Sequence, residues 1–225
     1  MSIPGIEGKV AIVTGGGHGI GRAYCLGLAR EGALVAVADI DEGAAQKVAT
    51  EIAKEGGQAL AVHVDVADEA STRQMADKVV AQWGRIDILV NNAAIFATIP
   101  MNRGGIMTID PEEWDRMMAV NLKGPFFCVR AVLPVMQKQK SGKIINISSG
   151  TVFKGSAGRI HYVTSKAGMI GFTRTLAREV GPDNIQVNAI APGSTLSEEN
   201  PDDSILEMRQ SAIRGRSLQR LQVPE

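Results

Sequence analysis

Short apolar stretches recur along the chain, with longer and more polar stretches between them. Each apolar stretch is too short for a helix and stays apolar without alternating, which is typical of strands covered on both faces. The predicted strands span residues 9–15, 34–40, 59–65, 86–93, 142–149 and 185–192. Helical apolar spacing predicts helices over 19–30, 42–55, 69–82, 111–139 and 162–180. This alternation predicts a parallel sheet built from β-α-β units.

The alternating pattern shows no linker and no internal repeat. A length of 225 residues suits one α/β domain, a doubly wound, Rossmann-like parallel sheet with helices on both faces. Beyond the last predicted strand the chain becomes polar. We expect residues 194–225 to form a substrate loop with short helices within the same domain.

Charge and composition narrow the range of partners. The 24 basic and 24 acidic side chains balance, and no basic stripe stands out, so nucleic acid is not an expected partner. The N-terminus lacks the pattern of a signal peptide, and no apolar stretch predicts a membrane span, so we expect a cytoplasmic protein. Cys25 and Cys128 fall in predicted helices without metal-ligand spacing, which predicts buried cysteines and no metal site.

A glycine-rich turn joins the first predicted strand to the first predicted helix, with the sequence T-G-G-G-H-G-I-G over residues 14–21. Bare backbone lets phosphates approach, and the unpaired N–H groups at a helix start favour their negative charge. A tight structural turn is the alternative for the glycines alone. The residues expected to contact a dinucleotide here are Gly15, His18, Gly19, Ile20 and Gly21.

Asp39 ends the second predicted strand, twenty residues after Gly19. That separation is typical of the carboxylate that accepts hydrogen bonds from the adenosine ribose, although a helix-capping role is an alternative. The carboxylate would repel a ribose 2′-phosphate, and neither Ile40 nor His18 supplies a fixed positive charge to hold one. The sequence therefore predicts NAD as the cofactor and disfavours NADP.

Tyr162 and Lys166 lie four residues apart at the start of a predicted helix, so their side chains share one face. A free tyrosine has a pKa of about 10. The charge of Lys166, with that of an oxidised nicotinamide ring, is expected to lower the pKa of Tyr162 toward physiological pH. Such pairs also occur on helices by chance, so the pair alone does not identify a catalytic site.

In combination, the motifs resemble the short-chain dehydrogenase/reductase family over residues 9 to 192. They are the glycine turn, Asn91-Asn-Ala-Ala94, Asn121, Ser149 and Tyr162-Val-Thr-Ser-Lys166, in the order and spacing of the family. The resemblance implies that Ser149, thirteen residues before Tyr162, positions the substrate oxygen while Tyr162 exchanges its proton. It also implies that Lys166 holds the nicotinamide ribose and that Asn121 anchors a water in a proton relay.

The resemblance implies further contacts with the cofactor. Asp65 and Val66 would contact the adenine, and Asn91 with Ala93 would line the nucleotide cleft. The family has a glycine where Ala94 stands, and we expect this small change to preserve binding. After the remaining expected contacts, Pro192 and Gly193, the family places a threonine on the cofactor, a role that Thr195 and Ser197 both fit.

These residues predict an oxidoreductase that transfers a hydride between NAD(H) and a secondary alcohol or ketone, with a tyrosine as acid/base. One alternative is an NADPH-dependent 3-oxoacyl-thioester reductase, and another is a catalytically weak, truncated NAD-binding form. The expected partner is a small-molecule alcohol or ketone. The resemblance also implies a homo-oligomer, either a dimer or a tetramer, that pairs through the helices predicted over 111–139 and 162–180.

The substrate determinants are expected in the loops 94–110 and 194–215. Met101, Met107, Val152 and Phe153 are candidates for an apolar substrate pocket, with ordinary loop packing as the alternative. We expect His161 to border the pocket without transferring protons, and His63 to pack within its strand.

The resemblance also bears on the end of the chain. Members of the family continue with one more helix and a seventh strand, so we expect a truncated C-terminus. The sixth strand would then be an exposed edge, with weakened stability or altered assembly.

Overall fold

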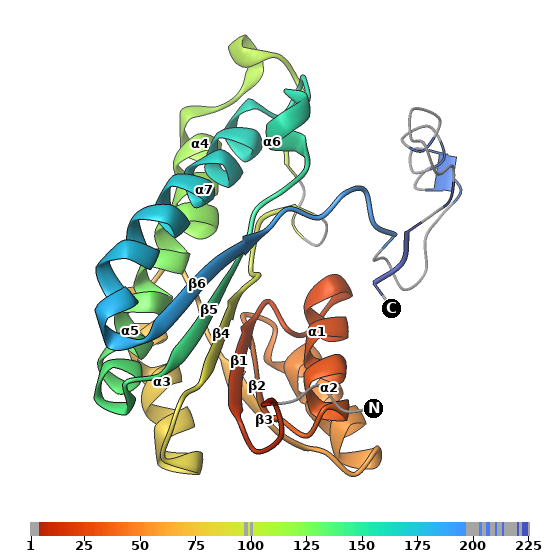
Figure 1. Cartoon of the computed structure of the whole chain (residues 1–225). Coiled ribbons are helices and arrows are strands. Elements are labelled where there is room, and N and C mark those ends of the chain that lie inside the picture. The colour runs from red at the N-terminus through yellow and green to blue at the C-terminus, as the bar shows by residue number, and fades with distance from the viewer. Residues whose placement is uncertain are drawn as a thin grey trace.

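The structure is a computed structural model that describes residues 5–96, 99, 101–196, 203, 206, 207, 210, 213, 220 and 222–224. Within these residues six parallel strands form one sheet in the order β3-β2-β1-β4-β5-β6 (Figure 1). The strands are β1 (Val10–Thr14), β2 (Leu34–Asp39), β3 (Gln58–His63), β4 (Ile88–Asn91), β5 (Gly142–Ile147) and β6 (Ile185–Ile190). The order reverses between β1 and β4, where an open parallel sheet forms its ligand crevice.

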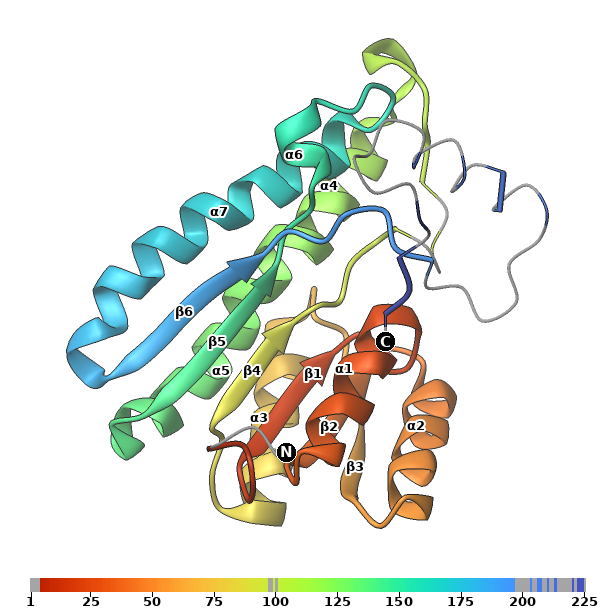
Figure 2. The same cartoon turned by 45° about the vertical axis from the view of Figure 1, so that its right-hand side comes forward.

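Helices cover both faces of the sheet (Figures 1 and 2). The α-helices are α1 (Gly19–Arg30), α2 (Glu42–Lys54), α3 (Glu69–Trp83), α4 (Pro111–Met118), α5 (Gly124–Gln139), α6 (Thr151–Lys154) and α7 (Ile160–Val180). Among the described residues, two short 3-10 helices are η1 (Ile106–Thr108) and η3 (Gly181–Asp183). The first two helices, α1 and α2, pack on one face, and α3, α5 and α7 pack on the other.

The strand β1 shows why its sequence is continuously apolar. Val10 and Ile12 belong to the apolar cluster under α3, α5 and α7. Ala11 and Val13 belong to the opposite cluster, under α1 and α2. Successive side chains of a strand point to opposite faces, so both sets must be apolar when helices cover both faces. The predicted doubly wound, Rossmann-like sheet is confirmed.

The helix predicted over 111–139 contains a π-helical segment, η2 (Ala119–Lys123), between α4 and α5. The widened turn does not interrupt the helical apolar spacing, so it has no sequence signature at the resolution of a 3.6-residue pattern. By length and composition alone this is the one described helical stretch apolar enough to cross a membrane. Cys128, Val132 and Met136 are nevertheless fully buried against the sheet, so the stretch packs as a core helix of this fold.

The carboxyl ends of the parallel strands meet at one edge of the sheet, and the chain after β6 returns across this edge (Figure 1). Thr195 there forms an isolated bridge with Gln222. The short helices expected within 194–225 fall largely outside the described residues, as does Ser197.

Candidate active site

A cleft of about 740 Å³ opens at the carboxyl edge of the sheet. The residues proposed from the sequence that line it are Gly15, His18, Gly19, Ile20, Gly21, Asp39, Asp65, Val66, Ala93, Ser149, Tyr162, Lys166, Pro192, Gly193 and Thr195. They come from the ends of all six described strands, or the turns directly after them, and from the starts of α1 and α7. Residues spread along the sequence thus converge on one cavity.

The glycine turn forms one wall of the cleft and brings bare backbone to its surface. Gly15 has a φ of +63°, and a Cβ there would lie 2.8 Å from the α-carbon of Ala93. A Cβ on Gly21 would overlap the carbonyl oxygen of Gly15. His18, the residue before α1, makes no capping hydrogen bond through its side chain, and the first turn of α1 contains no acidic residue. The positive end of α1 therefore suits a phosphate group.

Asp39 stands at the end of β2 with only 7% of its surface exposed. Its Oδ2 accepts a hydrogen bond from the backbone N–H of Gly17 at 2.9 Å, and its Oδ1 accepts one from the N–H of Asp41 at 3.0 Å. The carboxylate is thus held in place by the turn that lines the cleft. Among the described lining residues contributed by β1, β2, β3 and the turns after them, none is lysine or arginine.

Asn91 is not among the lining residues, whereas its neighbour Asn92 is. The Nδ2 of Asn91 donates to Oδ1 of Asn146 at 2.9 Å, inside the sheet. The Nδ2 of Asn92 donates to the carbonyl oxygens of Thr14 and Gly15, each at 3.0 Å. The lining position therefore belongs to Asn92 rather than to the Asn91 expected from the sequence, because the strand ends at Asn91 and the chain turns there.

Ser149 and Tyr162 meet in the cleft from different elements. Ser149 follows β5, Tyr162 lies in the first turn of α7, and both are buried. Burial raises the pKa of Tyr162, while a hydrogen bond with the Ser149 side chain and the charge of Arg159 lower it in part. The Oγ of Ser149 also accepts a hydrogen bond from Oγ1 of Thr151 at 2.9 Å. The serine hydroxyl is thus oriented toward the phenol.

Lys166 lies one helical turn beyond Tyr162 and is 3% exposed. Its Nζ donates to the carbonyl oxygen of Ile147 at 2.8 Å, and burial lowers the pKa of Lys166 to about 8. Lys166 is not one of the groups that shift the pKa of Tyr162. The protein groups alone therefore do not lower the pKa of Tyr162 toward physiological pH, contrary to what the sequence suggested. Burial disfavours the phenolate, and this effect outweighs the hydrogen bond with Ser149 and the charge of Arg159.

Asn121 lies behind the cleft, 1% exposed, on the π-helical segment η2. Its Oδ1 accepts a hydrogen bond from the N–H of Ile95 at 2.8 Å, and its Nδ2 lies 3.3 Å from Oγ of Ser165. These contacts join the loop after β4 to α7. The role of Asn121 in anchoring a water stays a prediction.

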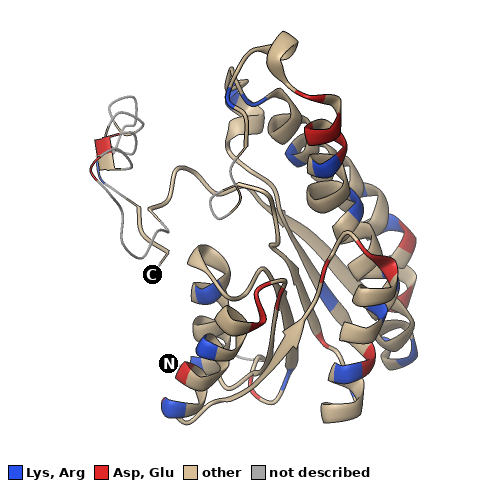
Figure 3. Ribbon diagram, turned by 180° about the vertical axis from the view of Figure 1, so that it is seen from behind, with Lys and Arg blue, Asp and Glu red and all other residues tan. Residues whose placement is uncertain are grey.

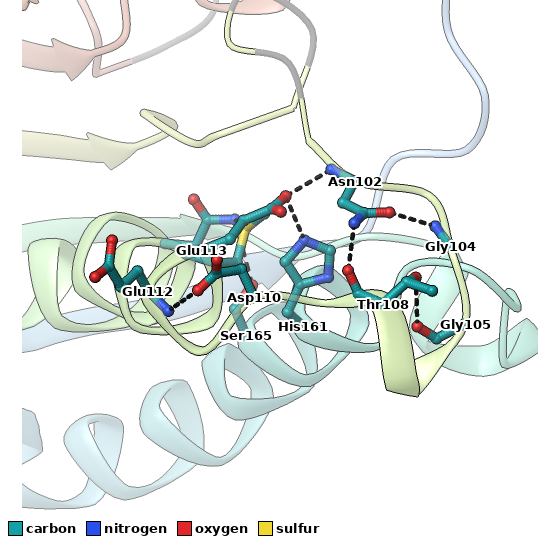
Figure 4. Close-up of polar contacts among 11 residues, drawn as sticks. Asn102, Gly104, Gly105, Thr108, Asp110, Glu112, Glu113, His161 and Ser165 are labelled. Atoms are coloured by element: carbon teal, nitrogen blue, oxygen red, sulfur yellow. Dashed lines mark hydrogen bonds and ion pairs between the residues drawn. The ribbon is translucent and has the colours of Figure 1, made fainter.

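His161 is fully buried beside Tyr162 and does not line the cleft, although the sequence suggested that it borders the pocket. Its Nε2 lies 3.3 Å from Oε1 of Glu113, on α4 (Figure 4). The same carboxylate oxygen accepts a hydrogen bond from the backbone N–H of Asn102 at 2.5 Å. His161 thus contributes to fastening the loop around Asn102 rather than to the cavity surface.

Other side chains also differ from expectation. His63 lies in β3, as predicted, but its side chain is exposed rather than packed.

The four residues expected to form an apolar substrate pocket do not line the cleft: Met101, Met107, Val152 and Phe153. Met107 and Phe153 are exposed. The apolar lining at the substrate end comes instead from Phe96, Ile99 and Val120. The Phe96 ring lies 4.9 Å from the Tyr162 ring, measured between centroids.

Three basic residues that no sequence motif singled out also line the cleft: Arg103, Lys154 and Arg159. They lie in the segments that follow β4 and β5. The signal that would have found them is their shared place in loops at the carboxyl edge of the sheet. Among the described residues, no group of three or more His, Cys, Asp or Glu side chains is arranged to hold a metal ion.

Comparisons with known proteins agree with this geometry. A model of the short chain dehydrogenase family matches residues 9–204. The 3-oxoacyl-[acyl-carrier-protein] reductase FabG of Thermotoga maritima is 38% identical over 223 residues, which cover 98% of this chain and 87% of the relative. The Staphylococcus epidermidis FabG is 41% identical over 191 residues, covering 84% and 76%.

A solved structure is similar over nearly the whole chain. It is a 3-ketoacyl-(acyl-carrier-protein) reductase from Brucella melitensis complexed with NADH. The TM-score is 0.86 at 30% sequence identity, with 97% of this chain and 87% of that chain covered.

Proposed function

This chain belongs to the short-chain dehydrogenase/reductase family of oxidoreductases, and on that premise we propose that it reduces 3-oxoacyl thioesters with NADH. The observation that carries the proposal is the meeting of Ser149, Tyr162 and Lys166 in one cleft with the bare glycine turn. The substrate class rests on the relatives, which are named as 3-oxoacyl and 3-ketoacyl reductases. Of the two enzyme hypotheses from the sequence, this choice favours the alternative, the 3-oxoacyl-thioester reductase, over the secondary alcohol or ketone enzyme. The proposed cofactor, however, is NADH rather than NADPH.

The cleft fits a dinucleotide because the glycine turn packs too closely against the rest of the protein to admit a Cβ at Gly15 or Gly21, which leaves a wall of bare backbone. The start of α1 and the turn from Gly15 to Gly21 would hold the pyrophosphate, and Asp39 would accept hydrogen bonds from the adenosine ribose. Lys166 and Tyr162 would hold the nicotinamide end. When bound, the nicotinamide donates or accepts the hydride.

The protein groups then handle the proton. The hydroxyl of Ser149 donates a hydrogen bond to the substrate carbonyl oxygen and holds it beside the phenol of Tyr162. As a new C–H bond forms at the carbonyl carbon, the Tyr162 O–H bond breaks and its proton passes to that oxygen, giving the alcohol. A buried phenol with a raised pKa is protonated at neutral pH, which suits reduction. Lys166, whose Nζ donates to the carbonyl oxygen of Ile147 and which does not shift the pKa of Tyr162, would act by holding the nicotinamide ribose.

NADH is the proposed cofactor because Asp39 is fixed at the ribose site. Its two oxygens are held by backbone N–H groups, so the carboxylate has no easy rotation away from a 2′-phosphate. The repulsion between the two anions is not offset by a lysine or arginine among the described lining residues of that end.

A simple secondary alcohol or ketone is the second candidate substrate. The observation that favours it is the Phe96 ring, which lies against Tyr162 and narrows the apolar side of the site. Steady-state kinetics with NADH separates the two candidates. We expect acetoacetyl thioesters to give a higher kcat/KM than unfunctionalised ketones of the same chain length, and the reverse order would select the second candidate.

We also propose that the enzyme works in the cytoplasm as a homo-oligomer. The two cysteines of the chain are free and buried, which suits a reducing compartment. Phe126, on α5, is an exposed aromatic residue on one of the helices expected to pair. Light scattering at micromolar concentration tests the assembly, and a monomer would contradict it.

A further inference from the structure

The substrate end of the cleft differs in charge from the cofactor end. Arg103, Lys154 and Arg159 line the part of the cleft that the segments after β4 and β5 supply. The acidic lining residues, Asp39 and Asp65, come from the segments at the ends of β2 and β3. The strand order places β2 and β3 on the opposite side of β1 from β4 and β5, so the two sets lie at different ends.

Close backbone packing brings two of the three basic residues to the same rim. Gly158 has a φ of +72°, and a Cβ at this position would lie 2.5 Å from the carbonyl oxygen of Arg103. The loop that contains Arg103 is thus pressed against the residue that precedes Arg159. Lys154 ends the short helix α6, directly before this segment.

The loop around Arg103 is held from inside. Glu113 Oε1 accepts the N–H of Asn102 and also contacts Nε2 of the buried His161 (Figure 4). The Asn102 side chain donates to the carbonyl oxygen of Thr108 at 2.6 Å and accepts from the N–H of Gly104 at 2.7 Å. These bonds fix the backbone on both sides of Arg103, so its place on the rim is set before any ligand arrives.

We propose that Arg103, Lys154 and Arg159 form an anion-binding rim, and that the substrate has a carboxylate or phosphate group that binds there. The proposal deepens the proposed function, on which it rests, by assigning a charge to the substrate. Guanidinium and ammonium groups on one wall of a cleft attract and orient such an anion through charge-assisted hydrogen bonds. The charge of Arg159 already reaches the phenol of Tyr162, whose pKa it lowers, so an anion held there lies next to the reacting atoms. On the helices seen in Figure 3, by contrast, Lys and Arg are interspersed with Asp and Glu.

Binding to the NAD⁺-saturated protein tests the rim without turnover, because an oxidised cofactor cannot reduce a ketone. Titration calorimetry would compare acetoacetate with methyl acetoacetate, and 4′-phosphopantetheine with pantetheine. We expect that in at least one of the two pairs the charged compound binds at least about tenfold more tightly than the neutral compound. Preference within the first pair identifies a carboxylate on the substrate itself, and preference within the second identifies the phosphate of a carrier.

Variants assign the preference to the rim. Arg159→Gln and Arg103→Gln should each lower the charged-to-neutral affinity ratio about fivefold, and 0.5 M salt should lower it as well. Lys47→Gln, which removes an exposed lysine of α2 outside the cleft lining, is the matched control and should leave the ratio unchanged. Equal affinity within both pairs, or a ratio that the rim variants do not change, would overturn the proposal. Because binding is read without catalysis, these outcomes stay separate from a failure to reduce thioesters.

Discussion

The two ends of the cleft are built by different means. At the cofactor end, backbone makes the surface, and N–H groups fix the carboxylates: Gly17 N–H holds Asp39, and Ala67 N–H donates to Asp65 at 2.8 Å. At the substrate end, loop side chains make the surface, among them Arg103 and Arg159. Backbone geometry follows from short motifs, whereas side chains on loops vary independently of the fold. The contrast explains why the cofactor is easier to infer than the substrate.

We expect the largest loss of activity when the proton donor is removed and the cofactor-binding residues are left unchanged. Tyr162→Phe removes the proton that reduction requires but keeps the ring beside Phe96. We expect kcat to fall by about 10³-fold or more, while the Kd for NADH changes less than about threefold. Stopped-flow kinetics and fluorescence titration measure the two quantities. Turnover close to that of the unmodified enzyme would remove Tyr162 from the mechanism.

A substitution at Asp39 tests which group makes the enzyme prefer NADH over NADPH. Asp39→Asn removes the charge that repels a 2′-phosphate and keeps an oxygen that can accept from Gly17 N–H. We expect the ratio of kcat/KM for NADH to that for NADPH to fall roughly 10- to 100-fold. Asp77→Asn, at an exposed position of α3, is the control with the same charge change. An unchanged ratio in the Asp39 variant would show that another group selects the cofactor.

Lys166 lies where the two ends meet, and its burial costs stability. Burial lowers its pKa from the ordinary 10.5 to about 8, so the folded protein binds this proton less tightly than the unfolded chain. The free energy of unfolding should therefore rise with pH between about pH 8 and pH 10.5. Below about pH 8 the folded protein carries the full free-energy cost of burying the charged Lys166. Lys166→Met removes this cost but also loses the hydrogen bond to Ile147, so it should stabilise the protein at pH 7 by roughly 2 kcal/mol.

Urea denaturation at pH 7 and pH 10 measures this effect, with activity measured alongside. The variant should be more stable yet inactive, and its advantage should shrink at the higher pH. Lys78→Met, at an exposed position of α3, is the control and should leave stability nearly unchanged. A Lys166→Met protein that is less stable at pH 7 would mean that the lysine contributes to folding.

We expect the smallest change in activity when only the loop at the substrate end of the cleft loses a contact. Glu113→Gln removes the charge that holds both Asn102 N–H and His161. We expect KM for the ketone to rise about threefold to tenfold, with little change in the Kd for NADH, because the loop around Arg103 loses its fixed position. Hydrogen exchange should become faster at residues 102–104 and stay the same in β1. Unchanged exchange in the loop would show that the carboxylate does not hold it.

The centre of the sheet was predictable because β1, β2 and β4 are buried on both faces and therefore continuously apolar. The edge strand β6 is different, because only Ile185 and Val187 are buried and the residues between and after them are exposed. The predicted strand 86–93 nevertheless overshoots β4, Ile88–Asn91, since Ile86 is buried without belonging to the strand. The predicted helix start at residue 162 misses the two residues that begin α7 at Ile160, where no side-chain cap marks the boundary. The π-helical turn at η2 was not predictable, because the buried positions Met117, Asn121, Cys128 and Val132 keep a helix-like spacing through it.

The site was predictable where a motif imposes a backbone shape. The glycine turn and the four-residue spacing of Tyr162 and Lys166 both place their residues in the cleft. The sequence did not distinguish Asn91 from Asn92, since that choice depends on where the strand ends. It also gave no sign of Arg103, whose loop is positioned by packing against Gly158 and by the hydrogen bonds of Asn102.

The proposed function requires that a hydride passes from NADH to the ketone bound in this cleft. The most direct measurement is kcat/KM of the full chain for NADH and for NADPH, with an acetoacetyl thioester as the ketone and cofactor absorbance as the readout. We expect consumption of NADH, with a kcat/KM at least about tenfold above that for NADPH. A preference for NADPH, or no consumption of either cofactor, would contradict it.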